Sequence, residues 1–220
     1  MRINKFVAGA SELSRRAADS AIASGRVLVN GRLPVLGQTI QTGDSVTLDG
    51  RELSQPQRSL TIMLNKPVGY VTSRDGQGSK TVYDLLPKDY HRLIPIGRLD
   101  KDSSGLLLLT NDGALANRLT HPSFGKQKIY QVELDKALTT EDHQQIEHGV
   151  RVEDYTSRLQ LKHLRANVWQ VTMSEGKNRQ IRKTFARLNY TVTKLHRSDF
   201  GEYQLAGLAV GDFRLVATDK

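Results

Sequence analysis

Charged residues that could take part in chemistry are concentrated in one polar segment, residues 97–105, with the sequence GRLDKDSSG. An apolar run flanks it on each side, at residues 93–96 and 106–109. These runs are short and lie close to a proline and several glycines, so we expect two buried β-strands rather than one helix. The segment between them then forms a polar loop at the edge of a sheet. Because such loops often carry catalytic groups, we expect Asp100 to be the reactive residue.

Several common kinds of active site are excluded by the rest of the sequence. Its six histidines form no HExxH pattern, and His143 and His148 are five residues apart, which does not place them on one helical face. Neither GxSxG nor GxGxxG is present. The stretch DGQGSKT lacks the P-loop spacing, because Gly78 is followed by Ser79. Without cysteine there is no thiol nucleophile and no Cys-ligated metal. Carboxylate, tyrosine and arginine chemistry remains, with no evident cofactor site.

The charge of the chain points to an anionic partner. Its 220 residues include 32 Lys or Arg against 23 Asp or Glu, a formal net charge of +9. Such an excess is typical of nucleic-acid binding, although a merely basic surface would also explain it. The distribution favours binding, since the stretch from Gly176 to Arg197 has no acidic residue and seven basic ones. They are Lys177, Arg179, Arg182, Lys183, Arg187, Lys194 and Arg197.

Turn and linker signals divide the chain into two parts. Residues 2–24 predict two short helices, with Ser14 as N-cap of the second and Gly25 at its end. Strands are expected at 27–29, 32–33 and 46–48, with an Asn30-Gly31 hairpin turn between the first two. Residues 51–59, RELSQPQRS, are polar and indicate a linker. We therefore expect one domain over residues 1–58 and another over 59–220.

The second part alternates strands with a few helices, which favours a mainly antiparallel mixed sheet flanked by helices, an α/β (α+β) fold. Besides the two strands already named, strands are predicted at 60–64, 128–132, 150–152, 158–162, 168–173, 192–195, 203–205 and 213–216. Helical segments are predicted at 82–86, 114–119, 139–147 and 179–188.

No apolar run approaches the length of a membrane span, and the first 16 residues lack a signal-peptide core. We therefore expect a cytoplasmic protein without a membrane partner, and a monomer.

Residues 2–50 resemble the S4 RNA-binding domain, through SRRAADSAIASGRVLVNG and PVLGQTIQTGDSVTL. The resemblance implies binding of structured RNA by the paired helices and the hairpin. Arg15 and Arg16 lie in the first turn of the second helix, where the helix dipole disfavours cations. This placement suggests that the two arginines bind a phosphate group. The alternative is that both are simply exposed to solvent.

Motifs spread over nearly the whole chain resemble the ribosomal pseudouridine synthases, in the branch that carries an N-terminal S4 domain. They are Leu64-Asn-Lys-Pro-x-Gly-Tyr70, Gly97-Arg-Leu-Asp100, Gly105-Leu-Leu-Leu-Leu-Thr-Asn-Asp-Gly113, Lys128-x-Tyr130 and Glu175-Gly-x-Asn-Arg-Gln-Ile-Arg182. Ser103-Ser104 stands where many relatives have threonine, and residues beyond Gly201 match only in outline.

The resemblance implies that Asp100 catalyses the isomerisation of a uridine to pseudouridine, which needs no cofactor because no atom is added. It further implies that Arg182 pairs with Asp100 and keeps it ionised, and that Tyr130 stacks on the uracil. The alternatives are a turn-forming aspartate for Asp100, a phosphate contact or a solvated helix residue for Arg182, and ordinary cross-strand packing for Tyr130. Ile181 and Leu195 are candidates for the apolar residue under the base. We expect Asp100, Tyr130 and Arg182 to meet in one cleft.

Arg98 is expected to open the RNA or hold the flipped nucleotide. The basic residues expected to contact RNA are Arg98, Lys177, Arg179, Lys183, Arg187, Arg15, Arg16 and Lys66. Their contacts would help offset the cost of flipping the uridine, and the binding should weaken as salt rises.

These motifs and the charge lead to three hypotheses. The first is an rRNA pseudouridine synthase acting on 23S rRNA, or alternatively on 16S rRNA, as free RNA or within a ribosomal subunit assembly intermediate. The second is a non-catalytic S4-type RNA-binding or ribosome-assembly protein. The third, a basic hydrolase acting on RNA, is disfavoured because no histidine pair or metal cluster is evident.

Overall fold

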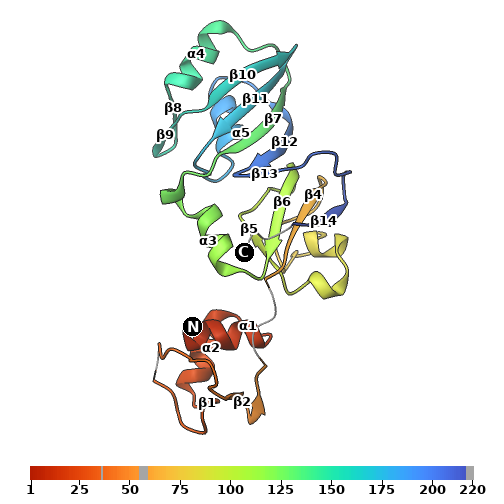
Figure 1. Ribbon diagram of the computed structural model, residues 1–220. Coiled ribbons are helices and arrows are strands. Elements are labelled where there is room, and N and C mark those ends of the chain that lie inside the picture. Colours follow the sequence, from red (N-terminus) through yellow and green to blue (C-terminus); the bar gives the residue numbers. More distant parts are fainter. Residues whose placement is uncertain (36, 55–58, 217–220) are drawn as a thin grey trace. The chain divides into compact units, whose positions relative to one another are not determined.

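The computed structural model describes residues 1–35, 37–54 and 59–216, and the chain forms two compact units, Met1–Ser59 and Leu60–Lys220 (Figure 1). The predicted boundary at residue 58 lies outside the described residues. Over these residues, none of the helices has the length and apolarity that a membrane crossing requires.

The first unit packs two helices on a small antiparallel sheet. The helices are α1 (Ile3–Ala10) and α2 (Arg15–Ala23), and the strands, in sheet order, are β1 (Val27–Val29), β2 (Val46–Leu48) and β3 (Arg51–Glu52). The Ser14 side chain accepts a hydrogen bond from the backbone N–H of Ala17, so the predicted N-cap of α2 is confirmed. Apolar residues at helical spacing, such as Ile3, Val7 and Ile22, form the core of this unit.

The Asn30-Gly31 turn forms, but the predicted strand at 32–33 is wrong. Asn30 and Gly31 both have positive φ, 50° and 75°, as a type I′ turn requires. Only one residue pair, Val29 and Arg32, is bridged beyond the turn. β1 instead pairs with β2, because Val27, Val29 and Val46 together bury an apolar face in the core.

The second unit is built on a nine-stranded mixed sheet. Its main order is β10-β11-β7-β12-β6-β4-β14, with β13 beside β12 and β5 beside β6. The strands are β4 (Thr61–Lys66), β5 (Ile94–Ile96), β6 (Ser104–Thr110), β7 (Lys128–Leu134), β10 (Gln160–Arg165), β11 (Val168–Met173), β12 (Val192–Phe200), β13 (Tyr203–Gln204) and β14 (Phe213–Leu215). Every pairing is antiparallel except the one between β6 and β12, so the predicted fold class is confirmed.

Helices and short turns complete this unit. The helices are α3 (Gly113–Thr120), α4 (Thr140–His148) and α5 (Gln180–Ala186), and the 3-10 turns are η1 (Val82–Leu85), η2 (Lys88–Tyr90) and η3 (Pro122–Phe124). A separate hairpin joins β8 (Val150–Val152) to β9 (Tyr155–Ser157). The strand predicted at 158–162 is displaced, since β9 ends at Ser157 and β10 starts at Gln160.

The run Leu106–Leu109 is buried on both faces of the sheet, as a continuous apolar strand requires. Leu107 and Leu109 belong to a core cluster that includes residues of α4 and α5, whereas Leu106 and Leu108 pack with residues of α3. β6 is therefore a rigid central strand, and the loop that precedes it carries Asp100.

Candidate active site

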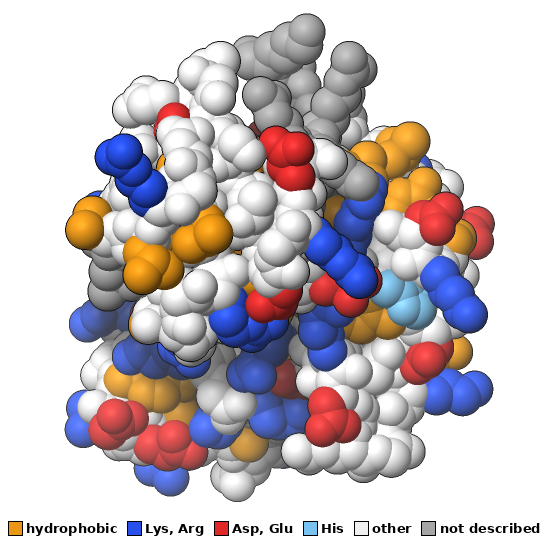
Figure 2. Space-filling model, turned by 90° about the horizontal axis from the view of Figure 1, so that it is seen from below, with side chains coloured by type: hydrophobic (Ala, Val, Ile, Leu, Met, Phe, Trp, Pro, Cys, Tyr) orange, Lys and Arg blue, Asp and Glu red, His pale blue; other side chains and the backbone are white. Residues whose placement is uncertain are grey.

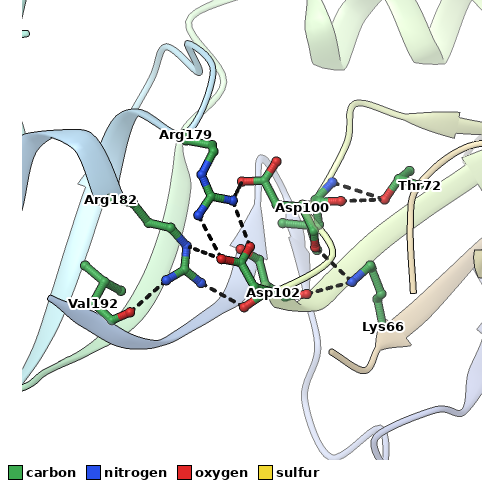
Figure 3. Close-up of polar contacts among 9 residues, drawn as sticks. Lys66, Thr72, Asp100, Asp102, Arg179, Arg182 and Val192 are labelled. Atoms are coloured by element: carbon green, nitrogen blue, oxygen red, sulfur yellow. Dashed lines mark hydrogen bonds and ion pairs between the residues drawn. The ribbon is translucent and has the colours of Figure 1, made fainter. Parts of the chain in front are cut away.

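The loop between β5 and β6 is fixed by buried side chains from an earlier part of the chain. The Thr72 hydroxyl donates to the carbonyl of Leu99 (2.8 Å) and accepts from its N–H (3.2 Å). The Lys66 ammonium donates to the carbonyls of Pro67 (2.9 Å), Asp100 (3.1 Å) and Ser103 (2.7 Å). These contacts hold the backbone on both sides of the Asp100 side chain (Figure 3).

The structure corrects the prediction that Lys66 contacts RNA. Its side chain is fully buried and the ammonium is used by three carbonyl oxygens. Burial lowers the pKa of Lys66 to about 8, and the negative charges of Asp100 and Asp102 partly oppose this. Lys66 therefore shapes the Asp100 loop from inside the fold.

The Asp100 carboxylate lies beside the first turn of α5, where a group of charged side chains meets. Its Oδ2 atom is 3.5 Å from Nη1 of Arg179, and its side chain is 38% exposed. The same guanidinium binds Asp102 more closely, with donor–acceptor distances of 3.0 and 2.8 Å to the two carboxylate oxygens. Asp100 thus has one long contact and an open side, whereas Asp102 forms a two-bonded pair.

Arg182 does not make the predicted pair with Asp100. Its Nε lies 3.2 Å from the carboxylate of Asp102, its Nη2 donates to the carbonyl of Asp102 (2.7 Å) and its Nη1 to that of Val192 (2.7 Å). The guanidinium within 4 Å of the Asp100 carboxylate belongs to Arg179 instead. The physical reason is that Asp102 is two residues further along the loop and presents both a side-chain and a main-chain acceptor to Arg182.

The two arginines differ in environment. The Arg182 side chain is only 13% exposed, and burial lowers its pKa although Asp102 opposes the change. The hydrogen bond from Arg179 holds the pKa of Asp102 below its usual value, and the charge of Arg182 adds to this effect. The pair between Arg179 and Asp102, whose side chains are 41% and 48% exposed, adds little to stability, so its main effect is to orient the two side chains.

The start of α5 is positioned by Gln180, a buried residue between the two arginines. Its amide donates to the Ser157 hydroxyl (3.1 Å) and to Glu175 (2.6 Å), and its oxygen accepts from the N–H of Lys177 (3.0 Å). Arg179, the N-cap residue, has a left-handed backbone with φ of 50°. The β8–β9 hairpin and the segment before α5 therefore hold the two arginines toward the Asp100 loop.

Tyr130 lies on β7 and is 8% exposed. It belongs to the same core cluster as Leu99, Ile181 and Leu195, and Leu99 directly precedes Asp100 in the loop. Tyr130, Ile181, Leu195 and Leu99 thus belong to one large core cluster that runs through the second unit, and the roles of the first three toward a uracil remain predictions.

Most of the basic residues between Gly176 and Arg197 are in contact with other parts of the chain. Lys183 pairs with Glu153 (2.9 Å), Lys194 pairs with Glu133 (2.8 Å), and Lys177 lies 3.8 Å over the ring of Tyr155. Arg197 is buried, and its Nε donates to the carbonyl of Leu106.

Arg187 is exposed and takes part in none of the ion pairs found among the described residues. Arg98 is exposed on the Asp100 loop, and Arg15 and Arg16 are exposed on α2 of the first unit. On the face shown in Figure 2, Lys and Arg side chains are spread over the surface with Asp and Glu among them. Contacts of these residues with RNA remain predictions.

The arrangement suits carboxylate chemistry. Asp100 is held on a rigid backbone, is partly open to solvent and lies next to a guanidinium. Within the described residues, no three His, Cys, Asp or Glu side chains are grouped so that they could hold a metal ion.

Comparison with known proteins shows to which family this chain belongs. A family model described as RNA pseudouridylate synthase matches residues 60–187, which is more than half of the chain. The chain belongs to the RNA pseudouridylate synthase family. The family prediction is therefore confirmed, and the protein is an isomerase of this family.

Relatives and a solved structure extend the match over the whole chain. The chain is 36% identical to ribosomal large subunit pseudouridine synthase B of Bacillus subtilis (strain 168), covering 97% of this chain and 91% of the relative. It is 34% identical to the dual-specificity RNA pseudouridine synthase RluF of Escherichia coli (strain K12), covering 100% and 77%. A structure titled as that of a pseudouridylate synthase aligns with a TM-score of 0.71 at 30% identity, covering 99% and 96%.

Sequence reasoning missed two features of this synthase's site. Asp102, two residues after Asp100, has no predicted role, yet both arginines lie closer to its carboxylate than Arg179 does to that of Asp100. Arg179 is predicted only to contact RNA, yet its guanidinium is the one within 4 Å of the Asp100 carboxylate. The predicted helix over 179–188 offered one signal, because two arginines three apart in a helix lie on one side of it and can share an anion.

Proposed function

We propose that this protein converts a uridine of ribosomal RNA to pseudouridine, with Asp100 as the catalytic residue and without a cofactor. In this reaction the N1–C1′ bond breaks, the uracil turns, and C5 bonds to C1′. The proton lost from C5 is balanced by one gained at N1, so no atom is added or removed. A carboxylate suits the first step, because it can stabilise or trap positive charge that develops at C1′.

The observation that carries the proposal is that Asp100, in a chain of this family, has a fixed backbone and an open carboxylate. Its backbone is fixed by Lys66, whereas its carboxylate has a single 3.5 Å contact with a cation and is 38% exposed. The carboxylate therefore has free lone pairs that can face a bound nucleotide. Asp100 either attacks C1′ or removes the 2′ proton, and both steps use the same ionised oxygen.

The neighbouring cluster supports a place for the base. Tyr130 would stack on the uracil, and its hydroxyl would take part in removal of the C5 proton. Ile181 or Leu195 would pack against the opposite side. The uridine must leave its stack to reach Asp100, at a cost of a few kcal/mol that is smallest in loops and bulges. Arg98, exposed on the same loop, would hold the flipped nucleotide.

We propose RNA of the large ribosomal subunit as the substrate, with 16S rRNA as the alternative. The name of the Bacillus subtilis relative specifies the large subunit, and so does that of a Xylella fastidiosa relative that is 36% identical. The first unit, with Arg15 and Arg16 exposed on α2, would act as an S4-type module that binds structured RNA away from the reacting base.

The test maps pseudouridines in both rRNAs from cells with and without this protein, and repeats the mapping with Asp100→Asn. We expect one or more large-subunit sites to disappear in both altered strains. Purified Asp100→Asn should bind the same RNA with unchanged affinity and form no product, whereas Asp89→Asn, at an exposed carboxylate in η2, should behave as the unaltered protein.

Two results would count against the proposal. Wild-type product formation by Asp100→Asn would remove the assigned catalyst. RNA binding without any pseudouridine that depends on the protein would favour the alternative of a non-catalytic RNA-binding or ribosome-assembly protein.

A further inference from the structure

Asp102 is the anion on which the charged groups of the site converge. Its carboxylate accepts two hydrogen bonds from Arg179, at 3.0 and 2.8 Å, and its Oδ2 lies 3.2 Å from Nε of Arg182. Its main-chain carbonyl accepts a further bond from Arg182 (2.7 Å). One loop residue therefore ties both arginines of α5 to the loop that carries Asp100 (Figure 3).

Asp100 also contacts the Arg179 guanidinium, but at a longer distance than Asp102 does. Nη1 of Arg179 is 3.0 Å from Asp102 and 3.5 Å from Asp100, so the two carboxylates share one guanidinium unequally. Hydrogen bonds between charged groups are strongest at about 2.7–2.9 Å, and the contact with Asp100 is well beyond that range. Two cations thus face two carboxylates, and Asp102 takes the close contacts.

We propose that Asp102 is a positioning residue for the isomerisation, which holds Arg179 and Arg182 beside Asp100 and keeps their hydrogen bonds off the Asp100 carboxylate. This inference rests on the proposed role of Asp100. A carboxylate that is closely paired with two guanidinium groups is stabilised in its resting state, and that stabilisation must be given up when the oxygen attacks C1′ or takes a proton. Asp102 avoids this loss while Arg179 stays 3.5 Å from the Asp100 carboxylate.

Loss of the Asp102 charge should redirect Arg179 to Asp100. In Asp102→Asn the main-chain bond to Arg182 and the bond from Arg182 to Val192 are retained, so α5 stays attached to the loop. Arg179, already 3.5 Å from the Asp100 carboxylate, then has Asp100 as its remaining carboxylate partner. The closer pair stabilises Asp100 in its resting state and slows its reaction.

The experiment measures RNA affinity and single-turnover formation of pseudouridine on an rRNA transcript carrying the mapped site. The proteins are the full chain, Asp102→Asn, Asp102→Glu and the control Asp89→Asn. For Asp102→Asn we expect the turnover rate to fall by about 10- to 100-fold, because misplaced groups near a reacting atom have effects of that size. We also expect little change in RNA affinity. Asp102→Glu restores the charge and should recover most of the rate.

Each other outcome has a definite meaning. A wild-type rate for Asp102→Asn would overturn the inference and leave the role of Asp100 intact. A lower rate that Asp102→Glu does not recover, or one in proportion to a loss of folded protein, would also overturn it, since Asp102 would then be only structural. Absence of product from the unaltered chain would overturn the inference together with the proposed function.

Discussion

Replacing Lys66 with methionine tests how the Asp100 loop is supported. Methionine is unbranched and of similar length, so Lys66→Met removes the ammonium without leaving a large cavity. The carbonyls of Pro67 and Ser103 lose the donor that Lys66 supplies, whereas the carbonyl of Asp100 keeps the N–H of Ser103 (3.1 Å). A carbonyl that is buried without a partner costs about 1–3 kcal/mol, and two of them together with the lost bond to Asp100 outweigh the cost of burying the charge. We expect the second unit to lose about 2 kcal/mol of stability at pH 7.

The pH dependence of this difference is set by the pKa of Lys66. Burial lowers that pKa from 10.5 to about 8 in the folded protein. Between about pH 8 and 10.5 the unfolded chain therefore binds more protons at Lys66 than the folded protein does, and the free energy of unfolding rises with pH. Because one pKa unit corresponds to about 1.4 kcal/mol, the full rise is about 3 kcal/mol. The difference between the two proteins should grow from about 2 kcal/mol at pH 7 to about 5 kcal/mol at pH 10.5.

Urea unfolding of the unaltered protein and of Lys66→Met at several values between pH 7 and 10.5 measures this difference directly. Titrations common to both proteins cancel when the two curves are subtracted. Lys88→Met, which removes an exposed amine from η2, is the matched control. A difference that stays constant across this range would refute the reasoning, because the buried ammonium would then have no depressed pKa. Product formation by Lys66→Met should also decrease, since the Asp100 loop loses its internal support.

Two further predictions concern other parts of the second unit. Gly105 has a φ of 106°, and a Cβ atom there would lie 2.2 Å from the carbonyl oxygen of Arg197, so Gly105→Ala should separate β6 from β12. We expect a loss of about 3 kcal/mol, seen as a melting temperature lower by roughly 10 °C; an unchanged melting temperature would contradict the close approach of the strands. Arg187→Gln should weaken RNA binding for all sequences alike and reduce the slope of log affinity against log salt by about 1. An unaltered slope would show that Arg187 makes no phosphate contact.

Local signals in the sequence were sufficient for most of the elements. The apolar run at residues 106–109 is short and continuous, and it forms the doubly buried strand β6. Ser14 caps α2 because a serine before a helix satisfies a free N–H wherever the helix lies. The Asn30-Gly31 turn also formed, but its second strand did not, because pairing depends on which distant strand offers the better apolar face.

The ion pairs between residues of different elements could not be predicted from local sequence signals. The segment from Gly176 to Arg197 has no acidic residue, yet Lys183 and Lys194 are paired with Glu153 and Glu133 from other elements. Sequence distance does not limit Coulomb attraction once the chain is folded, so a basic stretch is not necessarily a basic surface.

By itself the sequence determined the kind of protein and the identity of its reactive loop, because both depend on residue types and on spacing within short segments. The tertiary structure alone decided that Lys66 is a buried support rather than an RNA contact, and that Arg179 rather than Arg182 faces Asp100. Both outcomes depend on distances between groups about 35 to 80 residues apart, which form only when β4, the β5–β6 loop and α5 are brought together. At such separations the side-chain geometry of a few ångströms decides which oxygen a cation binds.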